Sequence, residues 1–233
     1  MKQYQRFYNY YEGIAQDYPR YWKRYRYYWK DIVNYCNFYI NENNSVLEIG
    51  CGTGETLNLL KGKNKVGIDF SPGMIDIAKV QFPTLEFHRM DAENLELDRK
   101  FDVIILSNVV GCFENVLDVF EQLKKVSHTN TRVIIAYYNY LWEPILKLGE
   151  WLGLKKRTPQ QNWLSKQDLE NLLYLGDFEA FRTTRKVLIP VRIPLISTLF
   201  NKYLAKLPVI NHLCLTNYIN ARPVNIQSKE SIN

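Results

Sequence analysis

The sequence predicts an α/β fold in which short buried strands alternate with helices around a largely parallel sheet. Residues 46–49 are a short apolar run, three glycines follow at positions 50, 52 and 54, and a helical stretch begins near Glu55. The same order of apolar run, polar turn and helical stretch recurs over residues 65–81 and 101–127. A chain of 233 residues that is 46% hydrophobic and 23% charged is long enough for one large core. Such alternation is typical of a sheet whose parallel strands are joined by helices.

The glycine-rich turn after the first strand predicts a nucleotide-like cofactor. Gly50, Gly52 and Gly54 let a ligand approach the backbone without interference from Cβ atoms, and the next helix points its first amides at the same place. A dinucleotide-binding turn needs a third small residue where this chain has Glu55. Because a carboxylate there would repel a pyrophosphate, the pattern disfavours a dehydrogenase and favours a cofactor without phosphate.

Glu48 lies two residues before the first glycine, and the pattern E-x-G-x-G-x-G resembles motif I of the class I S-adenosylmethionine-dependent methyltransferases. The resemblance implies S-adenosylmethionine as cofactor, with an acid for its cationic methionine end. It also implies that Asp69 accepts the ribose hydroxyls and that Asp91 lies at the adenine amino group, beside the backbone amide of Ala92. The cofactor contacts expected from the resemblance are Glu48, Gly50, Cys51, Gly52, Gly54, Asp69, Phe70, Met74, Asp91, Ala92, Glu93 and Asn108.

The remaining elements complete the same kind of fold. The predicted strands cover residues 46–49, 65–69, 85–89, 101–106, 132–138, 178–189 and 213–221, and the predicted helices cover residues 55–60, 72–81, 115–127, 141–154 and 166–175. Ser71 and Ser165 are suited to cap the helices that follow them. The resemblance implies a Rossmann-like seven-stranded class I methyltransferase sheet whose last strand is antiparallel.

We expect a single methyltransferase domain over residues 1–223. Within it, residues 1–40 would form a helical lid, residues 45–140 the core that binds S-adenosylmethionine, and residues 188–212 a lid or insertion before the last strand. Residues 224–233 are expected to be disordered.

The first thirty residues are unusually rich in tyrosine and tryptophan, interleaved with basic residues. The pattern Y-Y-x-x-I-A-x-x-Y over residues 10–18 resembles the family's N-terminal helix, which closes over the cofactor and helps to build the acceptor pocket. We therefore expect acceptor contacts from Tyr11 and Tyr18, and from Tyr138 and Asn139 after the fifth strand. The rings could instead only pack the lid on the sheet, or bind sugars or single-stranded nucleic acid.

Prolines bracket apolar stretches between residues 188 and 215, which predicts either an insertion over the acceptor site or an amphipathic segment that meets a membrane. Both ends of the chain are basic, within a net charge of +6, and would attract phosphates. No apolar run is long enough to span a bilayer, and the N-terminus lacks the apolar core of a signal peptide. The four cysteines are scattered, without the close pairs of a zinc site, which fits a reducing cytoplasm. We expect a cytoplasmic protein, with peripheral contact at the inner face of the membrane as an option.

The whole chain also resembles methyltransferases that occur beside or fused to family-2 glycosyltransferases in bacterial polysaccharide loci. The segments that carry this resemblance are residues 137–144, 161–165 and 213–218. It implies O-methylation of a small-molecule, sugar or lipid-linked glycan acceptor and a glycosyltransferase partner.

A sugar hydroxyl would need a proton acceptor, and His212, in the insertion, is the weak candidate for a catalytic base. No metal cluster is visible. An RNA-directed methyltransferase is disfavoured, and nucleic acid is not expected as a partner, because residues 107–110 replace the Asn/Asp-Pro-Pro-aromatic element that grips a flipped amine. A catalytically silent protein that binds S-adenosylmethionine stays open, because cofactor motifs do not prove a working acceptor site.

Overall fold

A computed structural model describes residues 3–153 and 155–224 of the chain. Its centre is a seven-stranded sheet with the strand order β3-β2-β1-β4-β5-β7-β6. The strands are β1 (Ser45–Ile49), β2 (Asn64–Asp69), β3 (Glu86–Arg89), β4 (Phe101–Ser107), β5 (Ser127–Tyr138), β6 (Phe178–Lys186) and β7 (Thr216–Pro223). Strands β1 to β5 pair in parallel, and β7 runs antiparallel to both β5 and β6. The predicted sheet, with its last strand antiparallel, is confirmed.

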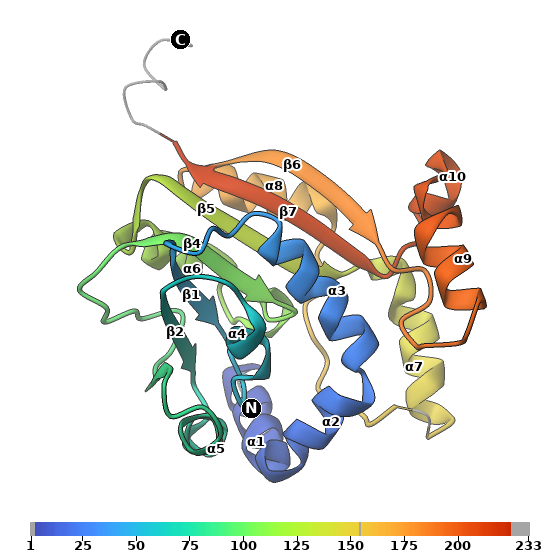
Figure 1. Cartoon of the computed structure of the whole chain (residues 1–233), viewed down its shortest axis with the longest axis horizontal. Helices are drawn as coiled ribbons and strands as arrows, with labels where there is room; N and C mark the ends of the chain where they lie inside the picture. Colours follow the sequence, from blue (N-terminus) through green and yellow to red (C-terminus); the bar gives the residue numbers. More distant parts are fainter. Residues whose placement is uncertain (1–2, 154, 225–233) are drawn as a thin grey trace.

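Helices cover both faces of this sheet (Figure 1). They are α1 (Gln3–Ile14), η1 (Ala15–Asp17), α2 (Tyr18–Arg24), α3 (Arg26–Asn37), α4 (Glu55–Leu59), α5 (Pro72–Gln81), η2 (Val110–Cys112), α6 (Val116–Lys125), η3 (Tyr140–Trp142), α7 (Glu143–Trp151), α8 (Lys166–Leu175), α9 (Ile196–Lys202), η4 (Leu204–Lys206) and α10 (Pro208–Asn211). One buried apolar cluster joins α6 and α8 to the sheet, and a second joins α3, α4 and α5 to the opposite face. No described helix has the length and apolar character needed to cross a membrane.

Local sequence explains why several helices begin where they do. Ser71 Oγ accepts a hydrogen bond from the Met74 amide at 3.1 Å, so the predicted cap of α5 is confirmed. Ser165 caps α8 in a capping box with Asp168, as predicted from the sequence. In α6 the buried residues fall at intervals of three and four, which points one face at the sheet.

Several predicted boundaries differ from the structure. Strand β5 begins at Ser127 rather than Arg132, directly after α6, which ends at Lys125. Strand β6 ends at Lys186 rather than near residue 189, because Val187 has φ of 67° and leaves the extended conformation. Strand β7 begins at Thr216 rather than Leu213, because α10 and the turn after it occupy the residues before it. Val224, the first residue of the predicted tail, is held by its amide, which donates to the Asp177 carbonyl at 2.8 Å; residues 225–233 lie outside the described residues.

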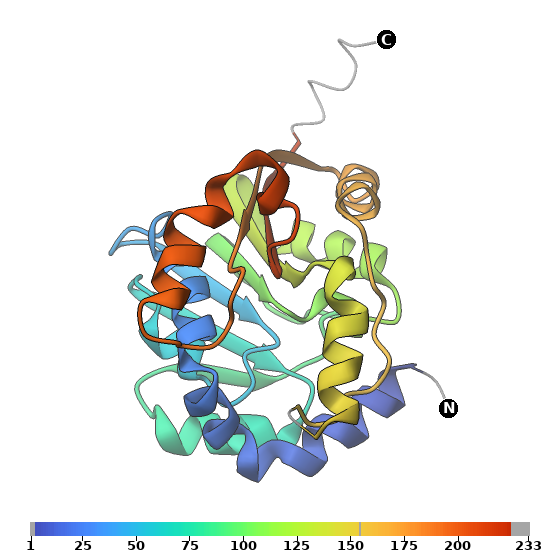
Figure 2. The same ribbon diagram turned by 90° about the vertical axis from the view of Figure 1, so that its right-hand side faces the viewer.

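Helices α1 and α2 lie at the carboxyl ends of the strands, and α3 continues from there over one face of the sheet, as Figures 1 and 2 show. Side chains hold α1 at both ends. Gln3 Nε2 donates to the carbonyls of Gly111 and Phe113 at 3.2 and 2.9 Å, just after β4. Glu12 Oε2 accepts from Ser71 Oγ and the Gly73 amide at 2.7 and 3.1 Å, at the start of α5. Helix α1 therefore spans from the loop after β4 to the helix after β2.

Candidate active site

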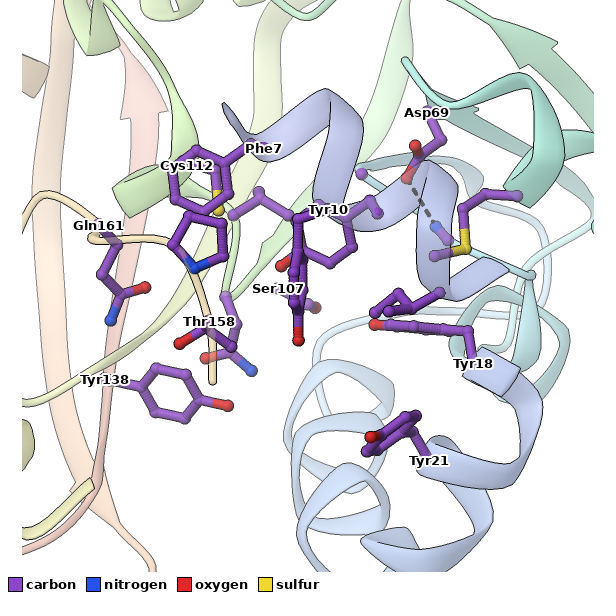
Figure 3. Close-up of a pocket in the computed structure, with 18 of the residues that line it drawn as sticks. Phe7, Tyr10, Tyr18, Tyr21, Asp69, Ser107, Cys112, Tyr138, Thr158 and Gln161 are labelled. Carbon is purple, nitrogen blue, oxygen red and sulfur yellow. Dashed lines mark hydrogen bonds between the residues drawn. The ribbon is translucent and has the colours of Figure 1, made fainter. Parts of the chain in front are cut away.

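A cavity of about 440 Å³ lies at the carboxyl ends of β1, β2 and β4, between the sheet and the N-terminal helices. Its size is typical of a small-molecule site. The glycine-rich turn and the strand ends form its floor, while aromatic residues of α1 to α3 form much of its wall. Figure 3 shows Tyr138 and Tyr21 approaching the cavity from opposite sides. The topology places the cavity where open parallel sheets bind ligands.

The three glycines of the turn have different tasks. All have positive φ, which favours glycine: 69° at Gly50, 53° at Gly52 and 87° at Gly54. Gly50 and Gly52 line the cavity, as expected of cofactor contacts. Gly54 does not line it; a Cβ there would lie 2.7 Å from Phe87 Cζ and 3.0 Å from Phe82 Cδ2. The expected contact from Gly54 is therefore replaced by close packing of the turn against the ring at β3.

Asp69 is 7% exposed and lines the cavity. One of its carboxylate oxygens accepts from the Gly52 amide at 3.0 Å, the dashed line at Asp69 in Figure 3, and the other accepts from the Ser71 amide at 3.0 Å. Burial raises the pKa of Asp69 to about 6, against the lowering effect of these amides. A carboxylate oxygen can accept more than one hydrogen bond, so Asp69 can order the turn and still receive ligand hydroxyls.

Two further carboxylates carry buried oxygen atoms without partners among the described residues. Glu48, at the end of β1, is 2% exposed; the Leu57 amide hydrogen-bonds its carboxylate, but Oε2 has no partner. Glu55 accepts from Thr53 Oγ1 at 2.5 Å, and its Oε1 has none. Burial, with the charge of Glu55 second, raises the pKa of Glu48 well above its usual value. Unpaired buried carboxylates are costly, so this end of the cavity is suited to a cation.

The acids after β3 have separate surroundings. Asp91 lines the cavity beside Ala92, and its Oδ1 accepts from the Glu93 amide at 3.0 Å. Glu93 also lines the cavity, but its Oε1 accepts from the amides of Glu114 and Asn115 at 2.7 and 3.3 Å. The Glu93 carboxylate thus holds the loop before α6. Cys51, Phe70 and Met74 complete the predicted cofactor residues that line the cavity.

The end of β4 places a strained asparagine in the cavity wall. Asn108 has φ of 58°, its amide donates to the Ala136 carbonyl at 2.7 Å, and its Oδ1 accepts from Tyr28 Oη at 3.0 Å. Within the described chain, Nδ2 of Asn108 and Oγ of Ser107 are buried without a partner. Strained backbone and unsatisfied buried donors tend to occur together at ligand-binding sites.

Three of the four residues expected to contact the acceptor line the cavity: Tyr11, Tyr18 and Tyr138. The ring of Tyr138 stacks on Tyr28 at 5.9 Å, and burial raises the pKa of Tyr138 to about 12, so its hydroxyl stays protonated. Tyr18 lies over the glycine-rich turn, because a Cβ on Gly52 would be 3.0 Å from Tyr18 Cε1.

Asn139 does not line the cavity, unlike its expected role. It is 4% exposed, and its Nδ2 donates to the carbonyls of His212 and Cys214 at 2.8 and 2.9 Å while its Oδ1 accepts from the Leu141 amide. His212 is exposed and also lies outside the cavity wall. The structure does not bring this candidate base to the site. Among the described residues no cluster of His, Cys, Asp or Glu is arranged to hold a metal ion.

Sequence reasoning missed Glu12 and Tyr28, which position the lid and Asn108. Glu12 falls inside the Y-Y-x-x-I-A-x-x-Y pattern, so the pattern marked its segment although not its role. Tyr28 reaches a residue eighty positions away, and no local signal indicates that pairing.

Comparison with known proteins adds four findings. Residues 21–181 match the family model described as a methyltransferase domain. The ubiquinone/menaquinone biosynthesis C-methyltransferase UbiE of Campylobacter jejuni is 32% identical over 81 residues, which are 30% of this chain and 34% of that enzyme, so the chain matches about a third of its length. Among solved structures, an S-adenosylmethionine-dependent methyltransferase from Thermotoga maritima has a TM-score of 0.71 at 15% identity, covering 93% of this chain and 99% of that chain. Magnesium protoporphyrin IX methyltransferase from Synechocystis PCC 6803, solved with bound S-adenosylmethionine, has a TM-score of 0.54 at 16% identity, covering 84% of this chain and 77% of that chain.

Proposed function

Because the chain belongs to the methyltransferase-domain family, we propose that it transfers a methyl group from S-adenosylmethionine to a small-molecule, sugar or lipid-linked glycan acceptor by O-methylation. One observation carries the proposal. Buried polar atoms of Glu48, Ser107 and Asn108, each without a partner among the described residues, line the same cavity at the carboxyl ends of β1 and β4. Such atoms are what a bound cationic ligand and a polar acceptor would satisfy.

The residues present fit S-adenosylmethionine. Glu48 would receive the ammonium of its methionine end, and Gly50 and Gly52 give the backbone close approach. Asp69 would accept the ribose hydroxyls, with Asp91 near the adenine. The cofactor supplies a methyl group already activated on a positively charged sulfur, so the chain's own task is to orient the acceptor and to exclude water.

The acceptor side of the cavity supports a ring-shaped, hydroxylated ligand. Aromatic faces of Tyr10, Tyr21 and Tyr138 provide flat apolar contact, and the Asn108 amide provides a fixed donor. Helix α1 covers this region and limits the access of water. Because the described histidines lie outside the cavity wall, we propose no histidine base.

The association with a glycosyltransferase and the cytoplasmic location are part of the proposal. Their support is the resemblance of residues 137–144, 161–165 and 213–218, together with four cysteines that are all free. All three segments contribute to the cavity wall, with Tyr138 and Glu143 from the first, Gln161 and Trp163 from the second and Leu215 from the third.

The test is incorporation of labelled methyl groups from S-adenosylmethionine into separated glycolipid, polysaccharide, RNA and small-molecule fractions of a bacterial extract. We expect label in the glycolipid or polysaccharide fraction, lost in the Asn108→Ala variant. Label confined to RNA would contradict the acceptor class. Tight cofactor binding in calorimetry with no labelled fraction would instead indicate a silent binding protein.

A further inference from the structure

Large apolar side chains are exposed mainly around the mouth of the cavity. Of the 22 exposed large hydrophobic residues in the described part of the chain, 16 lie in residues 140–152 and 191–213. We call these 16 side chains the apolar rim. Its members are Tyr140, Leu141, Ile145, Leu148, Trp151, Leu152, Val191, Ile193, Leu195, Ile196, Leu199, Phe200, Tyr203, Leu207, Val209 and Leu213. Large groups of exposed apolar side chains mark interaction surfaces.

Helix α9 is turned so that Ser197 and Asn201 face the protein and its apolar residues face outward. Ser197 is 2% exposed; its Oγ donates to the Val191 carbonyl and accepts from the Ile193 amide, both at 2.7 Å. One turn later, Asn201 Oδ1 accepts from the amides of Leu188 and Ile189 at 2.7 and 2.9 Å. The outward stripe consists of Ile196, Leu199, Phe200 and Tyr203, spaced at three and four residues. A helix in water would have the opposite orientation.

Helix α7 contributes to both the cavity wall and the apolar rim. Glu143, Leu146, Lys147 and Glu150 line the cavity, whereas Leu141, Ile145, Leu148 and Leu152 form an exposed stripe. Trp142 Nε1 donates to the Leu213 carbonyl at 2.8 Å, so the start of α7 is bonded to the end of the α9–α10 segment. In Figure 1 both helices stand beyond the carboxyl ends of the strands, and in Figure 2 both face the viewer. The two parts of the rim therefore lie on the same side of the molecule and are joined at Trp142 and Leu213.

The rim is basic. Residues 188–213 contain Arg192, Lys202 and Lys206 and no acid, and residues 140–158 contain four basic residues and two acids. Both of these acids are paired, Glu143 with Lys147 and Glu150 with Lys155, each at 2.5 Å. Exposed apolar side chains among unpaired basic ones are typical of interfacial helices. A second copy of the chain would bring two surfaces of the same charge together, which disfavours self-association.

We propose that the apolar rim docks on an anionic lipid bilayer, so that the cavity opens toward the membrane surface. This is an interfacial contact by exposed side chains, with no segment crossing the bilayer. Docking would allow a lipid-linked acceptor to enter the cavity from the membrane. That consequence rests on the proposed function, whereas the docking itself does not.

The test is flotation with vesicles of phosphatidylcholine alone and with equal parts of phosphatidylglycerol. We expect binding to the anionic vesicles that each engaged basic residue strengthens about fivefold, and this binding should weaken as salt is added. Leu199→Glu with Tyr203→Glu should abolish flotation. Val209→Glu should weaken it, whereas the matched Val80→Glu, also at 82% exposure but on α5, should not. Equal flotation of these two valine variants would overturn the proposal.

Calorimetry with S-adenosylmethionine on the same variants separates the two proposals. Unchanged cofactor binding shows that the variants fold, so absence of wild-type flotation would then refute docking and leave the proposed function intact. Flotation without cofactor binding would refute the function alone. A blue shift of tryptophan emission on anionic vesicles that Trp151→Phe removes would support docking. Sedimentation showing a dimer that Val209→Glu dissociates would refute it, because a second copy would then cover the rim.

Discussion

Replacing Glu48 by glutamine should weaken the binding of S-adenosylmethionine without unfolding the protein. In the cavity Oε2 of Glu48 is buried and has no partner among the described residues, while the Leu57 amide hydrogen-bonds the carboxylate. Glutamine keeps the size and an acceptor for that amide but removes the charge. A hydrogen bond to a charged group contributes about 1.5 to 3 kcal/mol. The expected loss of cofactor affinity is therefore about 10- to 150-fold.

The pH dependence of cofactor affinity tests the same role of Glu48, because the direction of the change can be predicted. Because the pKa of Glu48 is raised in the folded protein, its contribution to stability is present at low pH and is lost as pH rises through the folded pKa. The ligand's ammonium favours the ionised form, so wild-type affinity should increase over the same rise in pH. Affinity of Glu48→Gln should not follow that increase.

Isothermal titration calorimetry in buffers of different ionisation enthalpy measures both quantities, since it reports affinity and protons released. Wild type should release a fraction of a proton on binding below the pKa of Glu48, and Glu48→Gln should not. Glu150→Gln is the control, because Glu150 lines the same cavity but is paired with Lys155. Equal affinities and equal proton release in wild type and Glu48→Gln would refute the assignment of Glu48 to the ammonium.

Three other substitutions test the structure of the site and of the core. In the wild type, the free energy of unfolding should fall by roughly 3 kcal/mol as pH rises from 3.8 through about 6, because the pKa of Asp69 is raised to about 6 in the folded protein. Asp69→Asn should remove this pH dependence in urea titrations without ligand. An unaltered pH profile in the variant would contradict the prediction. Gly54→Ala should cost about 2 kcal/mol or more, since strain at positive φ is added to overlap with Phe87, whereas Gly153→Ala, with similar φ and open space, should cost about 1 to 2. Phe120→Ala should cost about 3 to 5 kcal/mol in chemical unfolding, because the ring is fully buried; a loss below 1 would be inconsistent with the described core.

The sequence predicts the parts of this molecule that local chemistry decides. The apolar run before Gly50, the acid at Asp69 and the serine caps are each readable from a few neighbouring residues. The sequence does not show that Asn139 lies outside the cavity wall, because its partners, the carbonyls of His212 and Cys214, come from more than seventy residues away. It does not show the packing of Gly54 either, because the ring that excludes a Cβ there belongs to β3.

The orientation of α9 could not be predicted for a related reason. The periodic placement of Ile196, Leu199, Phe200 and Tyr203 indicates an amphipathic helix but does not say which face is covered. Packing of Ser197 and Asn201 against the preceding loop decides that, and it depends on backbone groups that the loop leaves unpaired.

The attachment of α1 at its two ends also bears on turnover. Gln3 and Glu12 each bind groups that lie next to the cavity, one after β4 and one at the start of α5. Under the proposed function, a spent cofactor beneath this helix would leave when at least one of these attachments breaks, and the rate of that opening would then limit turnover. Glu12 would thereby influence the rate of release, while the carboxylates of the cavity floor would influence affinity.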